Sequence, residues 1–127
     1  MTSVASLPAS VATGDCGGPS LIAGSGDRAT HAADGVLEAF TNALVGLPGC
    51  ARERVVRLSG SPAKGVGPAV SVTYVRDAGA DTAWQGTVGP EGVLVVVPPA
   101  TEALVSFTND LVSGSEDRNL RLEMVTP

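Results

Sequence analysis

Apolar and polar side chains alternate along the middle of this chain with the period of two that is typical of a β-strand. Two segments show the pattern, 53–59 and 69–76, and a loop rich in Gly and Pro separates them. They predict a hairpin whose one face is apolar and whose other face is polar. The apolar positions are Val56, Leu58, Val70, Val72 and Tyr74, and the polar positions are Arg57, Ser59, Ser71 and Thr73.

A second hairpin is predicted over residues 82–97. Gly89-Pro90-Glu91-Gly92 has the composition of a tight turn, because Pro presets φ and Gly tolerates positive φ. The β-branched run 93–97 follows as a strand, and Pro98-Pro99 ends it because proline donates no amide hydrogen to a ladder. Before the turn, Trp84 and Val88 continue the apolar face, and Gln85 and Thr87 continue the polar face.

One amphipathic helix is predicted over residues 101–113. Thr101 and Glu102 suit a helix start, and Gly114 suits a left-handed C-terminal cap. This helix would cover the apolar face of the sheet. The apolar stripe consists of residues three and four positions apart, namely Leu104, Val105, Thr108, Leu111 and Val112.

The segment 28–47 can be written as a helix or as a strand. Its apolar residues favour the helix by local spacing, and a strand with Val36, Phe40 and Leu44 on one face remains open. Residues 2–13 with 21–23 suggest an N-terminal hairpin, and residues 120–124 alternate like a strand. The sequence therefore predicts one α+β domain over 1–127, an antiparallel sheet with an N-terminal hairpin and a C-terminal helix.

Composition fits a globular chain with a core of aliphatic residues. Of the 127 residues 43% are hydrophobic and only 3% aromatic, and the formal net charge is −5. An acidic protein of this kind does not coat nucleic acid generally. Five of the eight basic residues fall between positions 52 and 76, so either a local cationic surface or a strand edge protected by cations is possible.

The two cysteines lack the spacing of a metal site, and we expect free thiols without an obligatory intrachain disulfide. An interchain disulfide stays possible. The hexapeptide from Gly14 to Pro19 resembles the nucleophile loop of viral cysteine proteases of the chymotrypsin type. However, the sole histidine, His31, follows Cys16 instead of preceding it. We therefore expect no enzyme, metal or cofactor, no membrane segment, and synthesis in the cytoplasm.

The order of elements from Arg52 onward resembles the coat proteins of small single-stranded RNA bacteriophages. The helix and tail carry the likeness through Thr101-Glu102-Ala103, Asp110-Leu111-Val112, Ser115, Asn119-Leu120, Val125 and Pro127. The resemblance implies a dimer with one continuous sheet, in which each helix crosses onto the partner, and an icosahedral shell assembled in the bacterial host. Leu104 and Leu111 would then lie in the dimer interface.

The same resemblance implies that the polar sheet face meets a hairpin of the genomic RNA inside the virion. The alternative is a small dimeric α+β enzyme or ligand-binding module with a pocket between helix and sheet. The residues expected to contact RNA are Arg57, Ser59, Ser71, Thr73, Gln85 and Thr87, with Arg54 and Arg76 at the edges.

Overall fold

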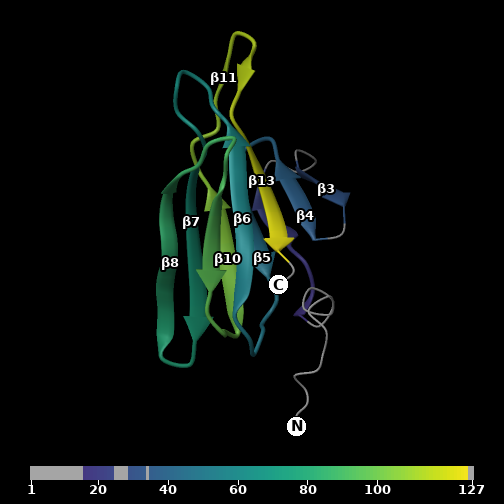
Figure 1. Ribbon diagram of the computed structural model, residues 1–127, viewed down its shortest axis with the longest axis vertical. Helices are drawn as coiled ribbons and strands as arrows, with labels where there is room; N and C mark the ends of the chain where they lie inside the picture. Colours follow the sequence, from purple (N-terminus) through teal and green to yellow (C-terminus); the bar gives the residue numbers. More distant parts are fainter. Residues whose placement is uncertain (1–15, 25–28, 34, 126–127) are drawn as a thin grey trace.

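The chain forms two antiparallel five-stranded sheets that pack face to face (Figure 1). The computed structural model describes residues 16–24, 29–33 and 35–125. The strands are β2 (Ser20–Gly24), β3 (Ala29–Ala33), β4 (Val36–Ala39), β5 (Ala43–Leu47), β6 (Arg54–Ser61), β7 (Ala69–Arg76), β8 (Gly79–Thr87), β9 (Val93–Val97), β10 (Glu102–Phe107), β11 (Val112–Ser113), β12 (Glu116–Asp117) and β13 (Asn119–Val125).

One sheet, called sheet I here, has the strand order β2-β5-β10-β7-β8, and the other, sheet II, has the order β3-β4-β13-β6-β9. The short strands β11 and β12 form a separate hairpin, which projects from one end of the molecule in Figure 1. The turn between β7 and β8 lies at the opposite end in that view. Strands from the C-terminal part of the chain thus occupy the centre of each sheet, β10 in sheet I and β13 in sheet II.

The strands pair in a nested order. The innermost pair is β7 with β8, followed outward by β6 with β9, β5 with β10, and β4 with β13. Successive pairs belong alternately to sheet I and sheet II, so the chain is one folded-back ribbon wound around a common core. This winding of eight strands is a jelly roll, to which β2 and β3 each add one edge strand.

The core is the layer of aliphatic side chains between the two sheets. Phe107 from β10 and Leu122 from β13 belong to it and are almost fully buried. The predicted inward positions Val56, Leu58 and Val72 are confirmed as buried. Trp84 packs partly against this cluster, and Val88 is buried. Aliphatic side chains from two sheets therefore build the core that the low aromatic content predicted.

The predicted helix over 101–113, and with it the α+β class, is wrong. Residues 102–107 form the central strand β10, which pairs with β5 on one side and with β7 on the other. Ala103, Val105 and Phe107 point into the core with a period of two, and only Val105 among them belongs to the stripe that suggested a period of 3.6. Pairing on both sides satisfies the backbone of β10, and this tertiary context overrides the local helical pattern.

The two predicted hairpins are also wrong, although their strands are confirmed. β6 and β7 belong to opposite sheets, and so do β8 and β9. The turn at 89–92 forms as expected, with the Gly92 amide donating to the Gly89 carbonyl at 3.1 Å, but it carries the chain from one sheet to the other. Alternation indicates which side chains face the core, but it does not indicate which strand lies alongside.

The connection between β6 and β7 contains a tight turn of its own and passes from sheet II to sheet I. Ala63 and Val66 exchange two backbone hydrogen bonds in a tight turn, which Lys64 and Gly65 enter with positive φ. A Cβ atom at Gly67 would lie 1.8 Å from the carbonyl oxygen of Val88, so the loop is pressed against the start of the β8 to β9 connection. Only glycine fits this crossing between sheets.

The ambiguous segment 28–47 is extended where the structure describes it, at residues 29–33 and 35–47. It contains β3, β4 and β5, and the bend at 40–42 sends β5 into sheet I while β4 stays in sheet II. The local preference for a helix is therefore wrong, and residues 36–44 do not form one strand either. β2 pairs with β5, and the predicted N-terminal hairpin is not tested, because residues 2–13 lie outside the described part of the chain. The tail 120–124 is confirmed as a strand within β13.

The strand assignment of 102–107 is tested by two substitutions in β10. Phe107→Ala removes a buried ring from the core and should lower the free energy of unfolding by about 3–5 kcal/mol. Leu104→Ala truncates a half-buried side chain on the outer face and should cost about 1 kcal/mol. Urea denaturation of both variants measures the difference. Equal losses would contradict the inward and outward faces described for β10.

Candidate functional site

The residues predicted to contact RNA are divided between the two sheets. Ser71 and Thr73 lie on the outer face of β7, and Gln85 lies directly opposite Ser71 on β8. Thr87, exposed at the end of β8, belongs to the same sheet. These four uncharged side chains are therefore gathered on sheet I, as the alternation predicted.

Arg57 and Ser59 lie on β6 in sheet II, on the opposite outer face of the molecule. Ser59 is only 6% exposed. One subunit cannot present Arg57 together with Ser71, Thr73, Gln85 and Thr87, because the core separates the two outer faces. The prediction of a single RNA-binding surface required β6 and β7 to be neighbours in one sheet, but the structure places them in opposite sheets.

Arg57 belongs to a row of ion pairs across the outer face of β4, β13 and β6. Its Nη1 donates to Glu123 Oε1 at 3.1 Å, and its Nη2 donates to the carbonyl oxygen of Glu91 at 2.7 Å. On the other side of Glu123, Arg121 Nη1 donates to Glu38 Oε2 at 2.7 Å. Two arginines are balanced by two glutamates, so this face offers no excess of positive charge to phosphate.

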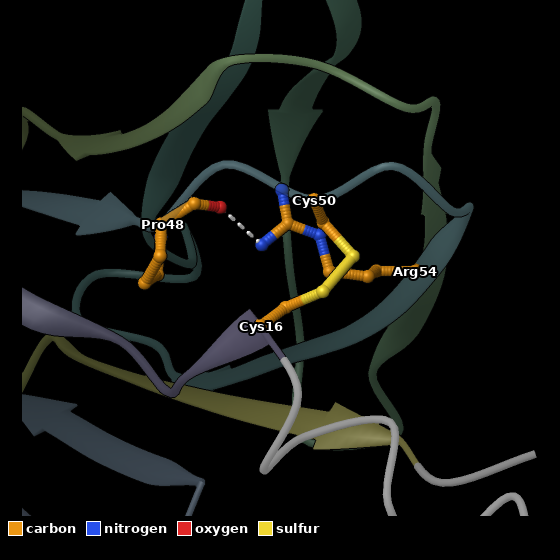
Figure 2. The surroundings of a disulfide bond; sticks show 4 residues. All are labelled: Cys16, Pro48, Cys50 and Arg54. Atoms are coloured by element: carbon orange, nitrogen blue, oxygen red, sulfur yellow. Dashed lines mark hydrogen bonds between the residues drawn. A yellow bond between two sulfur atoms is a disulfide. The ribbon is translucent and has the colours of Figure 1, made fainter. Parts of the chain in front are cut away.

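Arg54 is buried beneath the surface instead of lying at its edge. Its side chain is beside the Cys16–Cys50 disulfide, and Nη1 donates to the carbonyl oxygen of Pro48 at 2.6 Å (Figure 2). Among the residues that the structure describes, Nε and Nη2 have no hydrogen-bond partner, and burial lowers the pKa of the guanidinium. Alternation with Val56 and Leu58 already placed Arg54 on the core face, and this was the signal that could have identified its burial.

The disulfide between Cys16 and Cys50 contradicts the expectation of free thiols. The two Cα atoms are 5.3 Å apart. The pairing of β2 with β5 explains the bond, since the register of Ser20 opposite Gly46, continued four residues in each direction, reaches Cys16 and Cys50. Cys16 is thus no free nucleophile, while Gly14 and Asp15 of the protease-like hexapeptide lie outside the described residues.

An open depression of about 780 Å³ lies at the end of the molecule that carries the β7 to β8 turn. Arg76 borders it, and its Nε donates to the carbonyl oxygen of Pro99 at 3.1 Å. The guanidinium carbon also lies 5.0 Å from the centre of the Tyr74 ring, within range of a cation–π contact. The lining residues are Gly49, Cys50, Ala51, Arg76, Asp77, Ala78, Pro99, Ala100 and Thr101.

This depression has few of the groups that catalysis needs. Arg76, Asp77 and Thr101 are its ionisable or hydroxyl side chains, and the Thr101 hydroxyl already donates to the carbonyl oxygen of Val75 at 2.9 Å. Among the described residues no group of three or more His, Cys, Asp or Glu side chains is placed to hold a metal ion. In the same residues, no helix has the length and apolar character required to cross a membrane.

Sequence reasoning missed Arg118, a buried arginine that joins two loops. Its Nε, Nη1 and Nη2 donate to the carbonyl oxygens of Val66, Asn109 and Ala63 at 2.8, 2.6 and 2.6 Å. Its alternation with the buried residues Leu120 and Leu122 places it on the core face, and this was the signal that could have identified it. Unlike Arg54, this guanidinium is well satisfied and holds the β6 to β7 loop against the chain that follows β10.

Large apolar side chains remain exposed at the margins of the sheets. Leu94 and Val96 on β9 are 64% and 50% exposed, and Val112 in the β11 to β12 hairpin is 64% exposed. Ile22 on β2 is also exposed. The expected interface residues Leu104 and Leu111 are only half-buried, and the helix that was to place them against a partner does not form.

Comparison of the chain with protein-family models, with curated proteins and with solved structures finds no match. Function therefore has to be argued from the fold and from the surface alone.

Reduction of the disulfide should lower the free energy of unfolding by about 4 kcal/mol, as the chain-entropy account gives for cysteines 34 residues apart. Denaturant titration with and without reductant measures the change, and a Cys16→Ser, Cys50→Ser double variant should be insensitive to reductant. Identical unfolding midpoints for oxidised and reduced wild type would contradict the structural role of the bond.

The two buried arginines should respond differently to loss of charge. Arg118→Met leaves three carbonyl oxygens without their donor and should cost about 3 kcal/mol. Arg54→Met removes a buried charge with two unpaired donors and should change stability by less than about 1 kcal/mol. Thermal or chemical unfolding of both variants provides the measurement. A larger loss for Arg54→Met than for Arg118→Met would refute this account.

Proposed function

We propose that this chain is a structural subunit that associates with copies of itself into a closed shell, as a viral capsid protein does. The observation that carries the proposal is a jelly-roll winding whose sheet margins expose large apolar side chains. Jelly rolls form viral capsid domains, and also lectin domains and cupins, so the winding alone does not distinguish among these functions. Exposed apolar residues at an edge favour a surface that meets another protein.

The proposal rests on the jelly roll and not on the likeness to RNA-phage coat proteins. That likeness depended on a C-terminal helix crossing onto a partner, and the corresponding residues form β10 and the chain leading to β11. A second sheet covers the apolar face that the helix was expected to cover. A partner subunit is therefore not needed to complete the core. Contacts between subunits would be made by surfaces that the folded single subunit already presents.

The proposal leaves out an RNA-binding sheet face. The outer face of sheet I carries hydroxyl and amide side chains, and Arg57 lies on sheet II, where it is balanced by Glu123. Binding to RNA depends on neutralising phosphates with Lys or Arg. The overall charge of −5 also argues against binding to RNA phosphates.

The disulfide is compatible with this function. Disulfides persist in oxidising surroundings, which include the surface of a virion after release from a cell. A subunit made reduced in the cytoplasm would acquire the Cys16–Cys50 bond in the released particle. Because each bond lies within one subunit, it would stabilise the subunits of a shell without linking them.

The particle size of the purified, oxidised chain tests the proposal. We expect particles of megadalton mass, measured by size-exclusion chromatography with light scattering and seen as closed shells by electron microscopy. Thr82→Ala, which shortens an exposed polar residue of β8 and leaves every exposed apolar side chain in place, serves as a control and should assemble as the wild type does. A monomer at all concentrations would refute the proposal.

A further inference from the structure

Strand β9 is an edge strand of sheet II in the described part of the chain. It pairs with β6 on one side, and no described strand pairs with its other side. An antiparallel strand directs alternate N–H and C=O groups to its two sides, so β9 presents a row of unpaired backbone groups. Such a row accepts a further β-strand.

The other described edges of the two sheets are irregular, and β9 is not. The pairings of β2, β3 and β8 with their neighbours each contain a register shift, which bends an edge and discourages further pairing. The pairing of β9 with β6 has no shift over its whole length. β9 also lacks a charged side chain, whereas β8 contains Asp81. Among these edges, β9 is the one suited to continue a sheet.

The sequence of β9 complements itself in the antiparallel direction. If two copies pair about Val95, then Leu94 lies opposite Val96 of the second copy, and Val96 lies opposite its Leu94. These two side chains are 64% and 50% exposed on the outer face. Cross-strand contact between them removes apolar surface from water in both copies.

The same register brings opposite charges together at both ends of the strand pair. Glu91, exposed in the turn before β9, falls opposite Pro99 of the second copy. The carbonyl oxygen of Pro99 accepts a hydrogen bond from Arg76, whose side chain is also exposed. Each copy of Glu91 would therefore lie beside the guanidinium of Arg76 in the other copy, and the two-fold axis produces this pair twice.

We propose that β9 pairs antiparallel with β9 of a second copy of this chain. The pairing joins two copies of sheet II into one continuous sheet, and the Glu91 and Arg76 pairs fix its register. The inference rests on the proposed self-association and names the contact that would form its two-fold dimer.

Charged substitutions on the edge test the contact. Leu94→Lys with Val96→Lys should convert dimers to monomers in sedimentation experiments, because two cations would face two cations across the axis. Val112→Lys is the matched control, since Val112 is as exposed as Leu94 but lies in the β11 to β12 hairpin. It should leave the dimer intact. Unchanged circular dichroism and unfolding temperature establish that each variant is folded.

Charge reversal tests the register. Glu91→Arg and Arg76→Glu should each weaken dimerisation about tenfold by placing like charges together. The double variant should regain wild-type affinity, since it restores both pairs in the opposite sense. Structural damage by either substitution would add in the double variant and give no rescue, so failure of the rescue overturns this register.

The outcomes separate this inference from the proposed function. Shells that form equally well in wild type and in the Leu94→Lys, Val96→Lys variant overturn the β9 contact and leave the shell proposal standing. A wild-type dimer that the variant abolishes, without larger particles, supports the contact and overturns the shell. A wild-type monomer overturns both.

Discussion

Burial of one aliphatic layer between two sheets is the constraint on which the rest of this structure depends. Every strand that crosses the core contributes alternate side chains to the layer, and the jelly-roll winding brings them there from positions far apart in the chain. Because each sheet covers the apolar face of the other, the subunit needs neither a helix nor a partner to complete its core. Its outer faces and edges are thereby left free for contacts with other molecules.

The sequence predicted the strands of this fold better than their arrangement. Alternation at Val56 and Leu58, and at Val70 and Val72, correctly gave both the extended structure and the inward faces. The same period of two holds for any neighbouring strand, so it could not show that β6 and β7 lie in opposite sheets. The segment 101–113 failed for another reason, because one subset of its apolar residues has a helical period and a different subset has an extended period. Pairing of β10 with two neighbours then decided the outcome.

The candidate site was predictable to the same extent. Ser71, Thr73, Gln85 and Thr87 share one sheet, as their alternation indicated, but Arg57 faces the other way. Arg54 and Cys50 show what long-range register adds. Arg54 is buried next to the disulfide that Cys50 forms with Cys16. That disulfide depends on the pairing of β2 with β5, and no local sequence pattern connects these two strands.

The nested winding has a consequence for how the subunit is made. β13 is the last described strand to be synthesised, yet it joins β4 to β6 at the centre of sheet II, and the Glu38 to Arg121 contact across it spans 83 positions. A growing chain that lacks β13 holds β4 and β6 without the strand between them, so half of the core layer has no continuous sheet. Folding of sheet II must therefore wait until translation has passed β13, and contacts of such long range form slowly. Unfinished chains would present several unpaired edges at once, and premature association during synthesis is a hazard that this topology carries with it.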